Sequence, residues 1–386
     1  MAVPDGGPLR LLVLQPTPFC NLDCDYCYLP TRDNRSRLSL EILDAALERV
    51  LESPYLDGPF TLLWHAGEPL TVPPAFYDAA TSRLRAALAR HGLPTDLVRQ
   101  SLQTNAISIN ASWCDCFVRN DIHVGVSLDG PAFLHDAHRR TRSGLPSHDA
   151  VMRGIAWLQR RGVPFNVIAV LTAEGLDHAD ALYDFFTSHG ISELGFNMEE
   201  TEGENRRSSL DGAAAQAGLE ARYRRFMQRF WQRCLAEPGR LHLREFEGIT
   251  SLAGSNQRLR GTDMNTPFVI VNVDAQGRMS TFDPELLAVH TERFGDFVFG
   301  HVRHDRLVDI AANPKFQQVQ AEIAAGVQAC RSSCEYFGLC GGGTGSNKYW
   351  EHGRLDGAAT QHCRYRIQLV ADVVVEGMEQ ELGLAS

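Results

Sequence analysis

The sequence predicts an α/β fold, with a parallel sheet of βα units in the first half of the chain and a smaller α+β extension behind it. Short apolar runs alternate with longer amphipathic stretches as far as Asn197, a pattern typical of right-handed βα units. Six such units are too few for a closed eight-stranded barrel, so we expect a partial barrel or an open sheet. Behind Asn197 the alternation stops.

The predicted elements follow one another in a regular order. The run LLVLQ is the first strand, Ser39 caps the first helix, and the second helix opens at Pro73 and closes at Gly92. The expected strands span residues 11–15, 60–65, 97–103, 122–130, 165–172 and 193–197. The helices expected between them span residues 39–53, 73–92, 110–120, 147–162 and 178–189.

The second half of the chain has a different organisation. A polar, loop-like segment (198–212) precedes a long amphipathic helix (213–237), and residues 268–282 resemble a hairpin that turns at Gly277. A last helix is expected over residues 364–382. The expected divisions are a barrel (1–212), a bridging helical region (213–264) and a C-terminal extension (265–386).

The composition is that of an ordinary globular protein, with 44% hydrophobic and 22% charged residues among 386. The start MAVPDGGPLR does not resemble a signal peptide, and no window approaches 18 uninterrupted apolar residues. We therefore expect a cytoplasmic protein with no membrane partner. The formal charge of −10 argues against a nucleic-acid partner, because phosphates favour basic surfaces.

Three cysteines, Cys20, Cys24 and Cys27, form a C-x3-C-x2-C motif directly after the first expected strand. Parallel sheets place their chemistry in such loops, and thiolates select zinc, copper(I) or iron–sulfur clusters. A structural zinc site requires four ligands, and no fourth cysteine or histidine lies nearby in the sequence. A four-iron cluster held by three cysteines leaves one iron open for a substrate or cofactor. A zinc knuckle and buried free cysteines are the alternatives.

The motif resembles that of the radical S-adenosylmethionine (radical SAM) superfamily, a C-x3-C-x-aromatic-C loop after the first strand of a partial (β/α)6 barrel. The resemblance implies that the three cysteines hold a four-iron, four-sulfur (4Fe–4S) cluster. Its open iron would bind S-adenosylmethionine, whose cleavage gives methionine and a 5′-deoxyadenosyl radical. Tyr26, the aromatic residue of the motif, is expected to contact the cofactor.

The segment HAGEP after the second expected strand is similar to the family's G-G-E-P. The resemblance implies that the backbone of Ala66 and Gly67 and the carboxylate of Glu68 contact S-adenosylmethionine. Ala66 replaces a glycine of the family, which a backbone contact should tolerate. His65 is expected to face the cofactor, with a locally satisfied histidine as the alternative.

The segments LQTNA, VSLDG and HDAHR follow later strands and also look like family motifs. The resemblance implies that Ser127 contacts the ribose and that Asn105 lies near the site. Arg139 matches an arginine that pairs with the cofactor carboxylate in sulfatase-maturing relatives, a contact suited to a planar guanidinium. A surface salt bridge is the alternative for Arg139.

Four cysteines near the C-terminus form a C-x3-C-x5-C motif with a distant fourth member: Cys330, Cys334, Cys340 and Cys363. Four thiolates make a complete metal site, and zinc would fit as chemistry. The segment GGGTGSNK is not a phosphate loop, because Lys348 lacks the adjacent glycine and the following serine or threonine.

This segment resembles the SPASM domain, a C-terminal extension of radical SAM enzymes that act on peptides. The usual pattern has seven cysteines for two auxiliary clusters, but here Phe282 and Thr344 occupy two ligand positions. The resemblance implies one auxiliary 4Fe–4S cluster, fully ligated by the four cysteines and used in electron transfer. Asp283 matches an aspartate proposed as proton acceptor in sulfatase-maturing relatives; a cap on the turn before Pro284 is the alternative.

Nearly end to end, the chain looks most like the cyclophane-forming branch of these enzymes, which includes the maturases of glycine-rich ribosomal peptides. The segments that carry this resemblance are LQPTPFCNLDCDYCYLP, NMEETEG, STFDPEL, CEYFGLCGGGTGSNK and CRYRI. The resemblance implies a precursor peptide as partner and a bond between a side-chain β-carbon and an aromatic ring. One electron and one proton must then leave, for which the auxiliary cluster and Asp283 are the natural acceptors. An external one-electron reductant of the flavodoxin or ferredoxin type is expected.

Glu199 and Glu200, after the sixth strand, are candidate substrate contacts, with a solvated acidic loop as the alternative. Three other functions compete with cyclophane formation: formylglycine formation in sulfatases, thioether formation in peptides, and a zinc-binding scaffold without catalysis.

Overall fold

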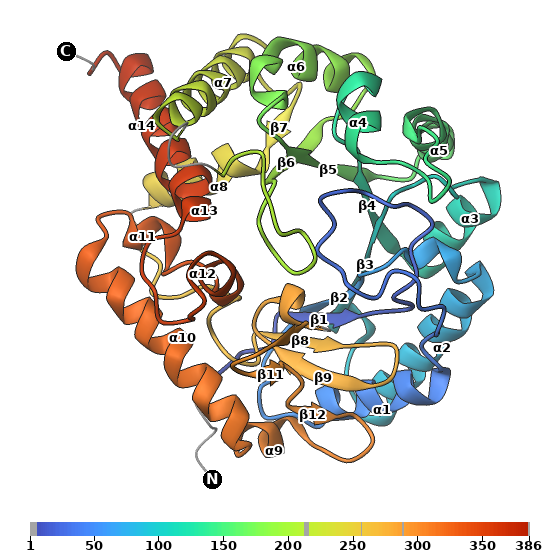
Figure 1. Cartoon of the computed structure of the whole chain (residues 1–386). Coiled ribbons are helices and arrows are strands. Elements are labelled where there is room, and N and C mark those ends of the chain that lie inside the picture. Colours follow the sequence, from blue (N-terminus) through green and yellow to red (C-terminus); the bar gives the residue numbers. More distant parts are fainter. Residues whose placement is uncertain (1–5, 212–215, 256, 288, 385–386) are drawn as a thin grey trace.

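The first half of the chain forms six parallel strands that follow their order in the sequence (Figure 1). The computed structural model describes residues 6–211, 216–255, 257–287 and 289–384. The strands are β1 (Leu11–Leu14), β2 (Phe60–Trp64), β3 (Val98–Thr104), β4 (Ile122–Ser127), β5 (Phe165–Leu171) and β6 (Glu193–Met198). The helices between them are α1 (Leu40–Leu51), α2 (Pro74–Arg90), α3 (Ala111–Asn120), α4 (Ala132–His138), α5 (His148–Arg160) and α6 (Ala179–Ser188). The predicted α/β fold with six βα units is confirmed.

Local interactions explain where these helices begin. Ser39 accepts a hydrogen bond from Ile42 N at 3.3 Å, and Asn110 accepts one from Trp113 N at 3.2 Å. Both are side-chain caps for backbone N–H groups that have no partner inside the helix. The helices cover one face of the sheet, where Leu12 and Leu14 of β1 are fully buried.

The sheet continues beyond these six strands and has ten strands in the order β12-β9-β8-β1-β2-β3-β4-β5-β6-β7. β8 (Ile270–Val273) pairs in parallel with β1, and β9 (Arg278–Thr281) pairs antiparallel with β8, which confirms the predicted hairpin. Gly277 at its turn has a φ of 91°. β12 (Gly300–His301) pairs with β9, and β7 (His242–Leu243) pairs with β6. β1 therefore has a partner on each side.

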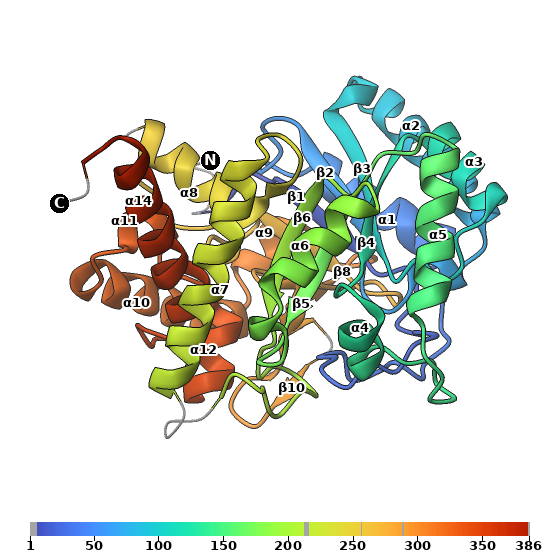
Figure 2. The same cartoon turned by 90° about the horizontal axis from the view of Figure 1, so that it is seen from above.

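The second half of the chain adds helices beside the sheet, and α7 packs between α6 and α14 (Figure 2). These helices are α7 (Gln216–Ala236), α8 (Arg244–Ser255), α9 (Leu307–Ala311), α10 (Pro314–Ser333), α11 (Phe337–Cys340), α12 (Gly345–His352), α13 (Gln361–Cys363) and α14 (Val370–Glu381). The short elements are the β10 (His290–Thr291) and β11 (Gly295–Asp296) pair, the π-helix Arg364–Leu369, and 3-10 turns at Pro69–Thr71, Thr95–Leu97, Gly175–Asp177 and Pro284–Leu286. The expected division at 212/213 and the first residues of the long helix lie outside the described residues.

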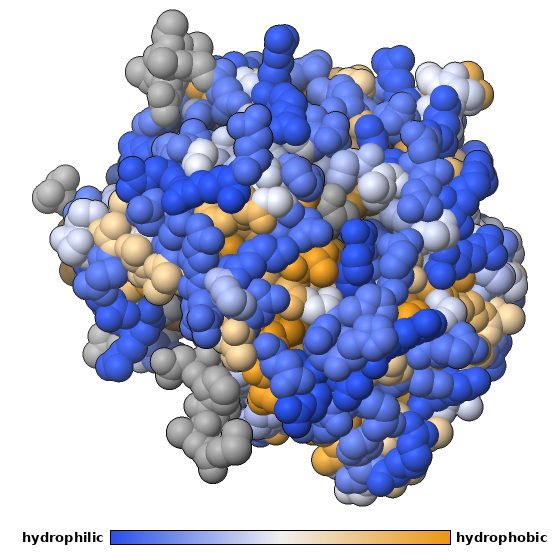
Figure 3. Space-filling model, turned by 60° about the horizontal axis from the view of Figure 1, so that its bottom comes forward, coloured by the Kyte–Doolittle hydropathy of each residue, from blue (hydrophilic) through white to orange (hydrophobic). Residues whose placement is uncertain are grey.

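No helix in the described part of the chain is both long and apolar enough to cross a bilayer. The face shown in Figure 3 is largely hydrophilic, with apolar side chains in its hollowed centre and in smaller patches toward its edges.

Candidate functional site

The first cysteine loop begins directly beyond β1, at the edge of the sheet where the parallel strands end. Cys20 N donates a hydrogen bond to Arg32 O at 3.1 Å, and Cys27 N donates one to Cys24 O at 3.3 Å. Burial raises the pKa of the Cys20 and Cys24 thiols to about 12. Such thiols keep their protons at neutral pH, and a metal group bound there would have to compensate the charge of the thiolates.

A buried carboxylate connects this loop to its neighbours. Glu68, which is 1% exposed, accepts hydrogen bonds from Thr104 Oγ1 at 2.6 Å and Asn105 N at 2.8 Å. Asn105 Nδ2 donates to Asn21 Oδ1 at 2.7 Å and lies 3.9 Å from Cys20 Sγ. The loops after β1, β2 and β3 are therefore linked. Both oxygens of Glu68 are used within the protein, and its contact with a cofactor stays a prediction.

The turn that precedes Glu68 has a constrained backbone. Ala66 and Gly67 adopt φ angles of 69° and 67°. A Cβ atom on Gly67 would lie 2.2 Å from Thr17 O, so only glycine fits this approach. The ring of His65 is neutral near physiological pH, because burial lowers its pKa to about 4.

The end of β4 carries further predicted contacts. Ser127 accepts a hydrogen bond from Gln103 Nε2 at 3.0 Å. Arg139 Nε and Nη2 donate to the two oxygens of Asp129 at 2.9 and 3.1 Å, and the Tyr26 hydroxyl donates to the same carboxylate.

This Arg139–Asp129 pair is not a surface salt bridge, because its side chains are only 10% and 4% exposed. Burial raises the pKa of Asp129, but the Arg139 guanidinium lowers it by a larger amount. The resulting pKa lies below the usual value of an aspartate. Arg139 thus has an internal partner, and its contact with a cofactor carboxylate stays a prediction.

The four C-terminal cysteines lie at the ends of three helices. Cys330 is in the last turn of α10, Cys334 follows that helix, Cys340 ends α11 and Cys363 ends α13. Burial raises the pKa of Cys340 and Cys363, and other thiols of the set raise it further. The four thiols are therefore close enough to influence one another.

All ten cysteines, including those of both sets, are free thiols. Within the described ranges, no three histidine, cysteine, aspartate or glutamate side chains converge as ligands of a single metal ion. Structural zinc binds four ligands around one centre, whereas a four-iron cluster binds each cysteine through a different iron.

Phe282 and Thr344, at the positions where the SPASM pattern has cysteines, have structural roles. Phe282 is fully buried and stacks on Phe316, with ring centroids 6.0 Å apart. Thr344 caps α12, and its hydroxyl accepts a hydrogen bond from Asn347 N at 3.3 Å.

Asp283 is buried between the hairpin and α12. The residue is 1% exposed, and its carboxylate accepts a hydrogen bond from Ser346 N at 2.8 Å, so it reaches α12 rather than capping the turn before Pro284. Burial, reinforced by the charge of Glu285, raises the pKa of Asp283 well above its ordinary value.

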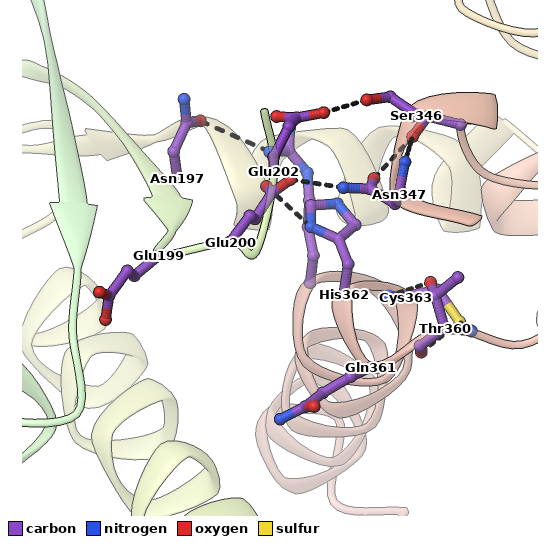
Figure 4. Close-up of polar contacts among 12 residues, drawn as sticks. Asn197, Glu199, Glu200, Glu202, Ser346, Asn347, Thr360, Gln361, His362 and Cys363 are labelled. Atoms are coloured by element: carbon purple, nitrogen blue, oxygen red, sulfur yellow. Dashed lines mark hydrogen bonds and ion pairs between the residues drawn. The ribbon is translucent and has the colours of Figure 1, made fainter. Parts of the chain in front are cut away.

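The two candidate glutamates after β6 point in different directions (Figure 4). Glu199 accepts a hydrogen bond from Ser209 N at 2.8 Å within its own loop. Glu200 accepts one from Asn347 Nδ2, and its Oε1 lies 2.8 Å from His362 Nδ1. Glu200 therefore contacts the C-terminal extension, and a contact of either residue with substrate stays a prediction.

Sequence reasoning missed Glu202, His362 and Arg366 in this region. Glu202, which is 7% exposed, accepts a hydrogen bond from Ser346 Oγ, His362 faces Glu200, and Arg366 Nη1 lies 3.5 Å from Asn197 Oδ1. Two signals were present: Glu202 belongs to the same acidic run as Glu200, and His362 directly precedes a cysteine of the second set.

Known proteins resemble this chain. The radical SAM superfamily profile matches residues 14–186. An uncharacterized protein of Synechocystis sp. is 48% identical over 379 residues, which cover 98% of this chain and 94% of that protein. A serine-type anaerobic sulfatase-maturating enzyme of Klebsiella aerogenes is 33% identical over 230 residues, covering 58% of this chain and 54% of the enzyme. The solved structure of native anSMEcpe with bound AdoMet (S-adenosylmethionine) and the Cp18Cys peptide superposes with a TM-score of 0.77 at 20% identity, covering 97% and 99% of the two chains.

Proposed function

Because this chain belongs to the radical SAM superfamily, we propose that it forms a carbon–carbon crosslink, a cyclophane, in a ribosomally made precursor peptide. The crosslink would join a side-chain β-carbon to an aromatic ring. The observation that carries this proposal is a complete second set of four cysteines in the same extension as the buried carboxyl of Asp283. A structural relative with a bound peptide supports a peptide as substrate.

S-adenosylmethionine and 4Fe–4S clusters are the cofactors of this family, as the sequence predicts. We assign the first cluster to Cys20, Cys24 and Cys27, and one auxiliary cluster to Cys330, Cys334, Cys340 and Cys363. Bound there, the cofactors would supply a 5′-deoxyadenosyl radical for hydrogen abstraction and an acceptor for one electron. The residues assigned to S-adenosylmethionine are Tyr26, His65, Ala66, Gly67, Glu68, Asn105, Ser127 and Arg139.

Asp283 takes the proton that leaves the aromatic ring when the crosslink forms. The ring loses one hydrogen as a proton and an electron, and the carboxylate receives the proton. The raised pKa of Asp283 makes its carboxylate a stronger base than that of an ordinary aspartate. The acceptor works only when deprotonated, so product formation should increase as pH rises through this raised pKa.

Formylglycine formation is the second candidate, because a sulfatase-maturating enzyme is among the relatives. Phe282 and Thr344 argue against it, since they remove ligands that the SPASM pattern uses for the inner auxiliary cluster. Thioether formation would use the same class of peptide substrate. The free cysteines suit the reducing cytoplasm, where a flavodoxin or ferredoxin would supply the electron.

Anaerobic reconstitution followed by incubation with aromatic-rich candidate peptides tests the proposal. We expect about eight irons per chain with matching sulfide, formation of 5′-deoxyadenosine, and a peptide product that has lost two hydrogens. Formylglycine formation from serine also removes two hydrogens, so an aldehyde probe and fragmentation must distinguish the products. A positive aldehyde reaction, or zinc in place of iron, would contradict the proposal.

Two variants separate radical generation from proton removal. Cys27→Ala should abolish deoxyadenosine formation, because it removes one of the three cluster ligands of the first loop. Asp283→Asn should retain deoxyadenosine formation and reduce the rate of crosslinking by about a hundredfold or more, since loss of a positioned base typically costs roughly 10²–10⁴-fold. Unchanged crosslinking in Asp283→Asn would refute the assigned role.

A further inference from the structure

The loop after β6 reaches across to the C-terminal helices through two carboxylates (Figure 4). Glu202 accepts a hydrogen bond from Ser346 Oγ, and Glu200 accepts one from Asn347 Nδ2 and lies 2.8 Å from His362 Nδ1. We call these five residues the carboxylate clasp. It joins a barrel loop to α12 and α13, segments that are far from it in the sequence.

Each carboxylate of the clasp leads to a different part of the proposed chemistry. Ser346, which holds Glu202 through its hydroxyl, donates its backbone N–H to Asp283 Oδ2 at 2.8 Å. His362, which faces Glu200, is followed directly by Cys363. One loop of the barrel is thus connected to both the assigned proton acceptor and a cysteine of the auxiliary set.

The pKa values of Glu200 and Glu202 are shifted in opposite directions. Burial, with the nearby charge of Glu200, raises the pKa of Glu202 well above its ordinary value, which favours the neutral form of this acceptor. Although burial also raises the pKa of Glu200, His362 and then Arg366 lower it below the ordinary value. Glu200 therefore carries a negative charge and presents one oxygen to each of two side chains.

We propose that the carboxylate clasp is a positioning device that fixes Asp283 and Cys363 over the mouth of the barrel. Glu202 holds the N-terminus of α12, whose Ser346 N–H orients Asp283, and Glu200 holds the segment that ends at Cys363. The role assigned to these two residues rests on the proposed function. The clasp itself is measurable without any peptide substrate.

Four variants of the full-length, anaerobically reconstituted protein test the clasp. Glu202→Ala removes the acceptor for Ser346, whereas Glu202→Gln keeps a neutral acceptor of similar shape. Glu200→Gln leaves one side-chain oxygen where Glu200 presents two, one to Asn347 Nδ2 and one to His362 Nδ1. Glu204→Gln is the matched control, because Glu204 lies on the same loop with an exposed side chain.

Hydrogen exchange of residues 344–352 and 360–363, followed by mass spectrometry, gives the first readout. We expect exchange about tenfold faster in 344–352 for Glu202→Ala and in both segments for Glu200→Gln, since loss of a hydrogen bond (Ser346, Asn347) or of a close charged contact (His362) lowers local stability. Glu202→Gln and Glu204→Gln should match the wild type. Unchanged exchange in Glu200→Gln and Glu202→Ala would overturn the clasp.

The midpoint potential of the auxiliary cluster, from a redox titration followed by electron paramagnetic resonance, is the second readout. We expect a more positive potential in Glu200→Gln, because a negative charge beside His362 is removed, and no shift in Glu204→Gln. Faster exchange with an unchanged potential would overturn the positioning role at Cys363. A wild-type protein that carries both clusters and makes no crosslink would instead contradict the proposed function.

Discussion

Ala66 adopts a left-handed backbone conformation that residues other than glycine rarely adopt. Gly67 lies in the same left-handed region, and the φ angles of the two residues are 69° and 67°. For an L-residue the left-handed region is unfavourable by roughly 1–2 kcal/mol. The backbone of the turn is therefore strained at Ala66. At Gly67 the backbone of Thr17 lies so close that no side chain fits.

Reciprocal substitutions in this turn should have opposite effects. Ala66→Gly should raise the free energy of unfolding by up to about 1 kcal/mol, because the strain is relieved. Gly67→Ala should lower it by about 3 kcal/mol or more, because the added Cβ meets Thr17 O at 2.2 Å. Denaturant unfolding of both variants measures the two effects, and equal stability of the two would contradict this explanation.

The raised pKa of Glu285 leads us to expect that the free energy of unfolding depends on pH. Burial raises the pKa of Glu285 from 4.5 to about 7. The folded protein therefore binds this proton more tightly than the unfolded chain, so the contribution to stability is complete below about pH 4 and is lost as pH rises through 7.

We expect Glu285→Gln to raise the free energy of unfolding by about 3 kcal/mol at pH 8 and by little at pH 4, because glutamine never acquires the buried charge. Urea unfolding at both pH values measures the difference. Glu292→Gln, at an exposed position, is the control and should show no such change. A gain for Glu285→Gln that is the same at both pH values would refute the assignment.

At the scale of elements, the loop after β4 is held to α4 by the buried Arg139–Asp129 pair. We expect Asp129→Ala to lower the free energy of unfolding by about 3–5 kcal/mol, because it leaves the guanidinium buried without its partner. Asp44→Ala breaks the ion pair with Arg83, in which the Asp44 and Arg83 side chains are 32% and 47% exposed. Its effect on the free energy of unfolding should therefore stay within about 1 kcal/mol. Thermal unfolding compares the two variants, and similar losses would contradict a structural role for the buried pair.

The strands and helices of the first half could be predicted because each has its own local signal, such as the cap at Ser39 or the apolar run of β5. The C-terminal elements have weaker signals. In α10 only a narrow stripe that includes Phe316, Val319 and Ile323 is apolar, and β7 and β12 are two residues long, too short to show a period.

The cysteine spacing also indicated both candidate metal sites from the sequence. The carboxylate clasp could not be found in this way, because Glu202 and Ser346 are 144 positions apart and only the fold brings them together. The internal partner of Arg139 was missed for a related reason: burial decides whether a guanidinium pairs with an internal carboxylate, and spacing does not reveal burial.

At the scale of the whole molecule, β1 is shared between the barrel and the C-terminal extension. Its four residues pair with β2 on one side and with β8 on the other. A chain that ends at residue 264 would expose the β8 side of β1, and an unpaired strand edge favours aggregation. The predicted domains should therefore not be independent.

We expect residues 1–264 alone to aggregate or to lose cooperative unfolding. Size-exclusion chromatography and thermal unfolding by circular dichroism measure both properties. A chain that lacks only residues 385–386 is the control and should behave as the full-length protein. A monomeric 1–264 fragment with a sharp unfolding transition would contradict the shared role of β1.

The double pairing of β1 also has a consequence for biosynthesis. Leu11 leaves the ribosome well before its partner Ile270, which lies 259 positions later in the chain. At ordinary translation speed this delay is on the order of tens of seconds. During that time the β8 side of β1 has no partner, so the strand that leads into the first cysteine loop is paired on one side at most.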